Sequence, residues 1–164
     1  MLEAERQVYS ALMNYARLQC EQIPTNRFTE QLSEGLNSPA WTLGHLAICN
    51  DYTLGLLGAP TKFSADWHRR FGPGSDPADI GGDAPGKGEL MGRLESGYQA
   101  VLDALHLATP ELLAEAHPEP SLKENYKTKG DLICVLMTGH VGLHLGQLAV
   151  WRKLAGLGHV NWPT

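Results

Sequence analysis

The sequence predicts an all-α protein, a four-helix bundle with a long crossover between its second and third helices, in one domain spanning residues 1–164. Four stretches repeat apolar residues at three- and four-residue spacing, the period that turns one stripe of an α-helix toward a core. No stretch shows the alternation of apolar and polar residues that is typical of a half-buried strand. A chain of 164 residues is also long enough to bury a substantial core.

The first helix is predicted over about residues 2–20, and Pro24 and Asn26 follow as breakers. Its apolar side chains share one side, and they are Tyr9, Leu12, Met13, Ala16 and Cys20. The second helix is predicted to begin at residues 37–40, where Ser38 can cap free backbone amides and Pro39 occupies the first turn. The sequence Gly-Ala-Pro at residues 58–60 marks its end.

The third helix is predicted over about residues 89–107, and a short connecting turn follows at residues 109–116. The fourth opens with Thr128 and Asp131, which have the spacing of a capping box, and it ends at Gly156 or Gly158. As one uninterrupted α-helix, it would turn one arc of side chains toward the core, formed by Leu132, Leu136, Leu143, Val150 and Leu154.

The crossover at residues 58–88 is dense in Gly and Pro and has neither helical nor strand periodicity. A connection of this length in a small bundle is usually functional or disordered. Trp67 and Phe71 predict an ordered crossover, because large aromatic groups are rarely left in solvent. Trp67, His68 and Arg69 are the crossover residues that we expect to contact a substrate.

Charge and cysteine content exclude several classes of protein. The net charge is −5 and no basic run is longer than a pair, so nucleic acid is not an expected partner. The three cysteines are odd in number and widely spaced, unlike a disulfide framework, which favours a reducing compartment. A charged N-terminus argues against a secretory signal, and no run of about 18 apolar residues suggests a membrane span. We therefore expect a soluble, cytoplasmic protein.

His140 and His144 lie one helical turn apart, and the predicted core arc contains both. Each buried imidazole would leave a ring nitrogen needing a partner, and a buried polar group without one costs about 1–3 kcal/mol. A shared metal ion removes that cost. The spacing therefore indicates a chelating pair that points into the bundle.

His45 is the third inward-facing imidazole, on the apolar face of the second helix. If the second and fourth helices are neighbours, the three histidines form a site with open coordination positions, as in catalytic zinc centres. Several glycines near these histidines leave room for ligands or close packing, namely Gly44, Gly139, Gly142 and Gly146.

Other interpretations of these residues remain open. A lone inward histidine such as His45 is more often a hydrogen-bonded core residue, and only the three together favour a metal. Cys49 could supply sulfur at the rim of the site or be a small core residue. Gln147 could brace an imidazole by a hydrogen bond or close the core. Asp51 lies on the far side of its helix, and the remaining histidines are expected at the surface or in loops, namely His68, His106, His117 and His159.

Two segments resemble the DinB-like superfamily, which includes bacillithiol transferases and mycothiol-dependent maleylpyruvate isomerase. PAWTLGHLA at residues 39–47 is similar to the family's Gly-His-Leu motif on helix two. GHVGLHLGQLAVWRKLAGL at residues 139–157 is similar to its His-x-x-x-His-x-Gly-Gln motif on helix four, and FGPGS at residues 71–75 resembles its crossover.

The resemblance implies a divalent metal held by His45, His140 and His144, with zinc or nickel favoured over manganese or iron. It also implies a homodimer. The implied activity is that of a thiol S-transferase or a hydrolase, with a low-molecular-weight thiol or another small molecule as substrate. The alternative is a non-catalytic homodimeric bundle that binds a metal or small ligand. A third interpretation is a dimeric structural module whose histidines only form hydrogen bonds.

Overall fold

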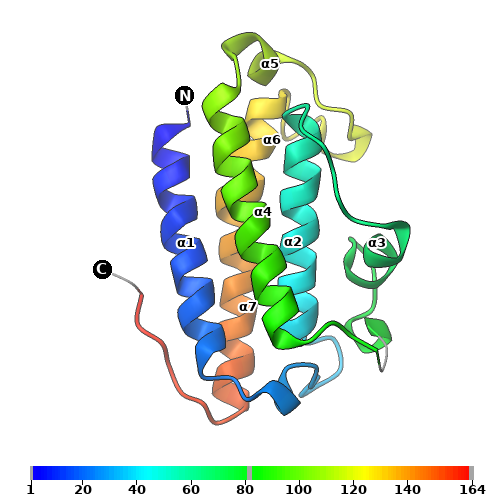
Figure 1. The fold of residues 1–164 in the computed structure, drawn as a ribbon, viewed down its shortest axis with the longest axis vertical. Coiled ribbons are helices and arrows are strands. Elements are labelled where there is room, and N and C mark those ends of the chain that lie inside the picture. The colour runs from blue at the N-terminus through cyan, green and yellow to red at the C-terminus, as the bar shows by residue number, and fades with distance from the viewer. Residues whose placement is uncertain (1, 81–82, 163–164) are drawn as a thin grey trace.

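Four long helical segments run side by side along the long axis of the molecule (Figure 1). The computed structural model describes residues 2–80 and 83–162. The first three long segments are α1 (Glu3–Glu21), α2 (Pro39–Leu56) and α4 (Lys87–Leu107). The fourth is a continuous rod made of α6 (Lys129–Val135), a π-helical turn (Leu136–His140) and α7 (Val141–Leu154). The prediction of an all-α four-helix bundle is confirmed, and the described residues pair as strands only in one isolated bridge, Ala116–Thr128.

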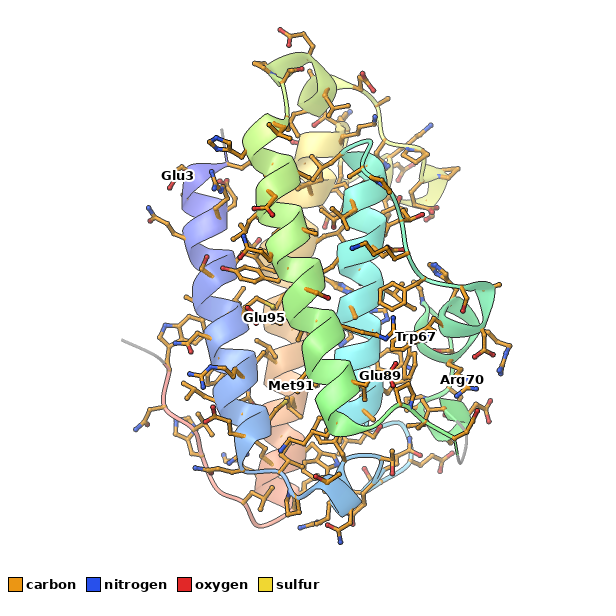
Figure 2. The ribbon with its side chains drawn as sticks, viewed as in Figure 1. Glu3, Trp67, Arg70, Glu89, Met91 and Glu95 are labelled. Carbon is orange, nitrogen blue, oxygen red and sulfur yellow. The ribbon has the colours of Figure 1, made fainter. Side chains whose placement is uncertain are left out.

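The helices that carry the three histidines are neighbours in this bundle. α2 packs along α4, α1 packs along α7, and α2 also contacts α7. The buried face of α1 consists of the residues that the helical period predicts, including Tyr9, Met13 and Cys20. Acidic side chains such as Glu3, Glu89 and Glu95 lie on the outside of α1 and α4 (Figure 2).

α2 is buried on almost every side. The Ser38 hydroxyl accepts the backbone N–H of Trp41 at 3.2 Å, and Pro39 occupies the first turn, as predicted. Only Tyr52 and Gly55 among its 18 residues are not buried. A helix that is covered all round lies in the centre of its fold, so His45 is in the interior whichever way its side chain points.

The crossover between α2 and α4 covers the outer side of α2 (Figure 1). It contains one short helix, α3 (Ala65–Phe71), and a 3-10 turn at Pro77–Ile80. Seven residues are too few for helical periodicity to show in the sequence, which is why α3 was not predicted. Both carboxylate oxygens of Asp51 accept backbone N–H groups of the crossover, from Lys62 at 2.6 Å and Phe63 at 3.3 Å. This buried carboxylate ties the start of the crossover to α2.

The fourth rod begins as predicted, because Thr128 and Asp131 form both hydrogen bonds of a capping box. The predicted core arc is wrong after the π-helical turn. Leu143, Val150 and Leu154 are 60, 49 and 61% exposed, and the core positions of α7 include Val141, Leu145 and Leu148. A π-helical turn takes more residues than an α-helical one, so it rotates everything that follows relative to α6.

The connection between α4 and α6 contains the short helix α5 (Pro110–Ala114) and a loop. His117 was expected at the surface or in a loop, and it lies in this loop with its side chain buried. Its Nε2 bonds to the Tyr126 carbonyl at 2.8 Å, and its Nδ1 accepts the backbone N–H of Glu119 at 3.2 Å. The ring joins the two sides of the loop. The residues next to His117 in the sequence do not predict this role.

By length and composition alone, the rod Lys129–Leu154 could cross a membrane. This differs from the expectation that no segment of the chain has that character. The core helix of a water-soluble bundle meets the same two criteria, and this rod packs against α1 and α2 with its capping groups at one end.

Candidate metal centre

Three imidazole rings meet between α2 and the fourth rod. His45 comes from α2, His140 from the π-helical turn and His144 from the first turn of α7. The ring centroid of His144 lies 4.6 Å from that of His45 and 4.6 Å from that of His140, and the His45–His140 separation is 5.2 Å. The structure thus brings together the three histidines predicted to bind a metal.

The potential ligand atoms of His45, Cys49 and His140 form the most compact part of this cluster. All three atoms lie within 4.8 Å of one another. The two Nε2 atoms are 3.1 Å apart, and the Cys49 Sγ is 3.7 Å from Nε2 of His45 and 3.4 Å from Nε2 of His140. This group shares His45 and His140 with the predicted triplet, has the sulfur of Cys49 from the next turn of α2 as its third member, and does not include His144.

The orientation of His45 is set by the crossover. Its Nδ1 lies 2.7 Å from the backbone carbonyl oxygen of Phe71, and the Trp41 ring stacks on it at a centroid distance of 4.6 Å. A carbonyl oxygen only accepts, so Nδ1 carries the proton and Nε2 presents its lone pair to the cluster. Phe71 was not predicted to take part.

Gly44 allows this close approach of the crossover to α2. A Cβ atom at position 44 would lie 2.3 Å from a ring carbon of Phe71. The glycine beside the first histidine of the motif therefore has a packing reason, since any side chain there would displace the residue whose carbonyl holds His45.

The orientation of His144 is set by two amides. Its Nδ1 donates to Oε1 of Gln147 at 3.0 Å, and the same oxygen accepts a hydrogen bond from Nδ2 of Asn37 at 2.9 Å. Gln147 occupies the bracing position considered for it in the sequence. Asn37, just before α2, was missed because nothing in the sequence links it to a residue 110 positions away.

Burial keeps all three imidazoles neutral. It lowers the pKa of His45, and it lowers the pKa of His140 to about 4 and that of His144 to about 3, with a further contribution from the neighbouring histidines. Burial also raises the pKa of the Cys49 thiol to about 12. Neutral imidazoles are donors that zinc, nickel and other first-row ions accept, and the hydrogen bonds at Nδ1 leave the Nε2 lone pairs of His45 and His144 free, so the residues present fit a divalent metal.

His140 is the member of the cluster that faces outward. His45, Cys49 and His144 are buried, whereas His140 is partly exposed and follows the exposed Gly139. A Cβ atom at position 139 would meet nothing within 4 Å, so the space beside this edge of the cluster is open.

The crossover residues predicted to contact a substrate occupy different environments. The Trp67 ring lies between those of Phe63 and Phe71, at centroid distances of 4.7 and 4.9 Å, and the Arg93 guanidinium lies 4.5 Å from its centroid. Trp67 therefore packs α3 against the bundle. Arg69 is exposed and forms an ion pair with Asp66 of the same helix.

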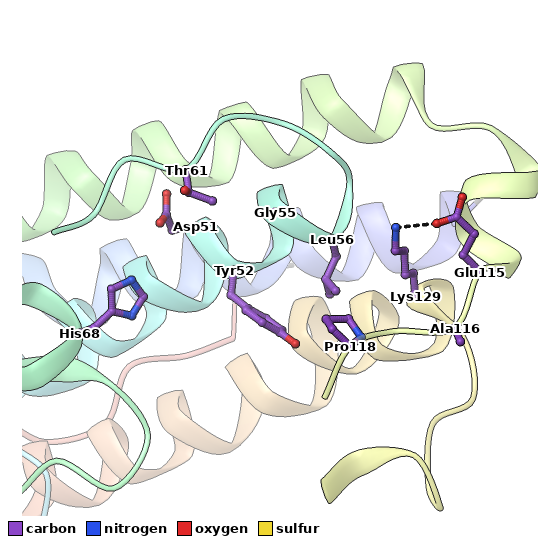
Figure 3. A pocket seen from close by; sticks show the side chains of 10 residues that line it. All are labelled: Asp51, Tyr52, Gly55, Leu56, Thr61, His68, Glu115, Ala116, Pro118 and Lys129. Carbon is purple, nitrogen blue, oxygen red and sulfur yellow. Dashed lines mark hydrogen bonds and ion pairs between the residues drawn. The ribbon is translucent and has the colours of Figure 1, made fainter. Parts of the chain in front are cut away.

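His68 lines a cavity of about 540 Å³ beside the second half of α2 (Figure 3). The far wall of the cavity carries the ion pair between Lys129 and Glu115, 2.7 Å apart. Tyr52 also lines it and follows Cys49 on the same face of α2. The Tyr52 hydroxyl is buried and has no hydrogen-bond partner within residues 2–80 and 83–162.

Comparison with known proteins gives one result that bears on this site. Neither a curated protein nor a solved structure matches the chain significantly. The family model described as the DinB superfamily matches residues 2–148, which include all three histidines of the cluster and the crossover. Since this match covers most of the 164 residues, the chain belongs to the DinB superfamily.

Proposed function

We propose that this protein is a divalent-metal-dependent enzyme, a thiol S-transferase or a hydrolase, in which His45, His140 and His144 hold zinc or nickel. The observation that carries the proposal is the convergence of three neutral imidazoles, two of them braced through Nδ1 so that Nε2 is left free. The same nitrogen donors would also accept manganese or iron. A single cytoplasmic domain with neither nucleic acid nor membrane as partner is part of this proposal.

A metal ion would join the nitrogens of this buried cluster. His45 and His140 present Nε2 atoms to each other at 3.1 Å, and removing such groups from water without good partners costs about 1–3 kcal/mol each. A divalent cation there would supply Lewis-acid chemistry to a substrate bound beside it. Its affinity would also offset the desolvation of the imidazoles.

The chain itself supplies a place for the substrate. The cavity lined by Tyr52 and His68 lies next along the face of α2 that carries His45 and Cys49. His68 is exposed at this cavity, and the Tyr52 side chain forms part of its wall. Both are proposed to bind and orient a small molecule such as a low-molecular-weight thiol.

The test begins with metal-free protein titrated with zinc, nickel and manganese, followed by turnover assays with panels of thiols, electrophiles and esters. Saturable turnover that needs the metal, and that the His144→Ala variant lacks, supports the enzyme. The control is His106→Ala, which changes an exposed histidine of α4 away from the cluster. Failure to bind any of the three metals would overturn the proposal.

A second function, metal or small-ligand binding without turnover, is favoured by the position of Cys49. Its sulfur lies within 3.7 Å of two ligand nitrogens, where a catalytic zinc site keeps a position open for substrate. Tight metal binding with no turnover across the panels would support this function instead.

Homodimerisation through α7 completes the proposal. Leu143, Val150 and Leu154 are largely exposed on one face of α7, together with the exposed Gly146. Contiguous apolar surface of this kind is typical of an interface, and a two-fold dimer would bury the same stripe from both copies.

A further inference from the structure

We propose that the Cys49 sulfur is a direct ligand of the metal, so that the centre has three nitrogen donors and one thiolate. The inference rests on the proposed function only in requiring that a metal binds at the histidines. Because a fourth protein ligand fills a tetrahedral centre, it favours the second function, binding without turnover. It concerns a ligand outside the three-histidine motif, and it changes which metals the centre accepts.

The separations within the cluster match the edges of a zinc tetrahedron. With bonds of about 2.0 Å to nitrogen and 2.3 Å to sulfur, such a tetrahedron has nitrogen–nitrogen edges of about 3.3 Å and nitrogen–sulfur edges of about 3.5 Å. The observed separations are 3.1 Å between the two Nε2 atoms, and 3.4 and 3.7 Å from these atoms to Sγ. Three corners of a mixed nitrogen–sulfur site are therefore already at ligand spacing.

The helix itself holds the sulfur in this place. Cys49 follows His45 by four residues, so both side chains lie on the same face of α2, one turn apart. Cys49 is only 7% exposed, and the polar atoms within 4 Å of its sulfur include the two imidazole nitrogens. Its thiol thus points into the cluster and away from solvent.

The other two cysteines show that this arrangement is specific. Cys20 is buried in the apolar core formed by α1, and Cys134 lies 3.9 Å from a carboxylate oxygen of Glu5. The structure describes all three cysteines, and the compact group of ligand atoms includes Cys49 alone among them. Cys134 therefore serves as a matched control.

Charge gives a physical reason for a thiolate at this position. Three neutral imidazoles leave the full double charge of a divalent ion uncompensated in a buried site, which is costly. When the sulfur–metal bond forms, the S–H bond breaks and its proton passes to the solvent, so the bound thiolate removes one unit of that charge. Sulfur also favours zinc and cobalt over manganese, which prefers oxygen donors.

The experiment is a titration of metal-free, full-length protein with Co²⁺ in the absence of oxygen, followed by absorption spectroscopy. We expect a near-ultraviolet sulfur-to-cobalt charge-transfer band together with the visible bands of a tetrahedral ion. Cys49→Ser and Cys49→Ala should lose the charge-transfer band and keep visible bands, whereas Cys134→Ser should keep both. Competition with a chelator should show zinc affinity at least tenfold weaker in both Cys49 variants, since even outer partners of ligands are worth about 10–100-fold.

The outcomes separate this inference from the proposed function. Visible bands without a charge-transfer band in the wild type, or a charge-transfer band that survives in both Cys49 variants, would overturn the sulfur ligand and leave the histidine site intact. Absence of any cobalt or zinc binding would overturn both proposals. Helical circular dichroism of each variant distinguishes loss of the ligand from loss of the fold.

Discussion

The backbone carbonyl oxygen of Phe71 accepts a hydrogen bond from Nδ1 of His45 at 2.7 Å. This bond joins the last residue of α3 to the central helix α2 at the residue that faces the other two histidines. Phe71 is completely buried, and its ring lies against the backbone of Gly44. The crossover therefore does more than connect helices, because it determines which nitrogen of His45 is free to bind a metal.

We predict that Gly44→Ala disturbs the cluster through Phe71. The added methyl group would lie 2.3 Å from a Phe71 ring carbon, so the ring and its carbonyl must move. Overpacking of this kind costs about 1–3 kcal/mol of stability, and the loss of an outer partner of a ligand weakens metal affinity about 10–100-fold. Urea unfolding and chelator competition measure the two effects.

Gly55→Ala is the matched control for this substitution. It lies on the same helix, but its Cβ atom would meet only Thr61 at 3.4 Å, which is ordinary contact. Alanine is the better helix former by about 1 kcal/mol, so this variant should be at least as stable as the wild type. Equal behaviour of the two variants would show that Phe71 does not position His45.

A second prediction concerns the pair of amides behind His144. Asn37→Ala removes the donor that holds Oε1 of Gln147, and Gln147→Leu removes the acceptor for His144 Nδ1. Both variants should bind zinc more weakly, by about tenfold for Asn37→Ala and up to about 100-fold for Gln147→Leu. Because the two residues act through one oxygen, the effects in the double variant should not add.

The control for this pair is Asn14→Ala, which removes an exposed amide of α1 whose oxygen accepts a hydrogen bond from Arg17. It should leave zinc affinity unchanged. Additive losses in the Asn37/Gln147 double variant, measured by chelator competition, would mean that the two amides act independently.

Asn37 and Phe71 support the histidines, and residue spacing in the sequence does not predict either role. The helical period and the capping signals predict the four long helices, and the four-residue spacing places His140 and His144 on one face. Asn37 and Phe71 reach the site from segments without periodicity, and their roles depend on how the chain folds back over α2. No local pattern encodes such a contact, although Gly44 beside His45 is a signal of close approach.

The core-facing residues of the fourth rod were predicted wrongly for a different reason. A period of 3.6 residues was applied across the whole of residues 129–154, and the π-helical turn at Leu136–His140 breaks it. His140 and His144 still face inward, toward His45. Leu143 and Val150 do not, since one extra residue in the turn moves the core stripe to Val141 and Leu145.

A third prediction is that the metal-free protein loses stability in mild acid. The pKa of His140 is lowered to about 4 and that of His144 to about 3, against an ordinary value of 6.5 in the unfolded chain. As the pH falls below 6.5, these histidines bind protons in the unfolded chain but stay neutral in the folded protein, so the free energy of unfolding decreases. The contribution of these groups is fully present above that pH.

Urea unfolding of metal-free protein between pH 7.5 and about 4.5 measures this dependence. Replacing both His140 and His144 by Asn should flatten the profile, whereas the exposed His106→Asn control should not change its slope. The same slope in the double variant as in the wild type would show that other groups control the acid response.

The last prediction concerns the exposed apolar stripe of α7. Leu143, Val150 and Leu154 are too exposed for a monomer to gain from them, whereas a second copy would bury them against the same residues of its own α7. We expect the wild type to be dimeric by light scattering at micromolar concentration, and Leu143→Glu combined with Val150→Glu to be monomeric, because charges in such an interface repel across the two-fold axis. Leu107→Glu is the control, since Leu107 is 80% exposed at the end of α4 and should leave the dimer intact. A monomeric wild type would leave the stripe without this explanation.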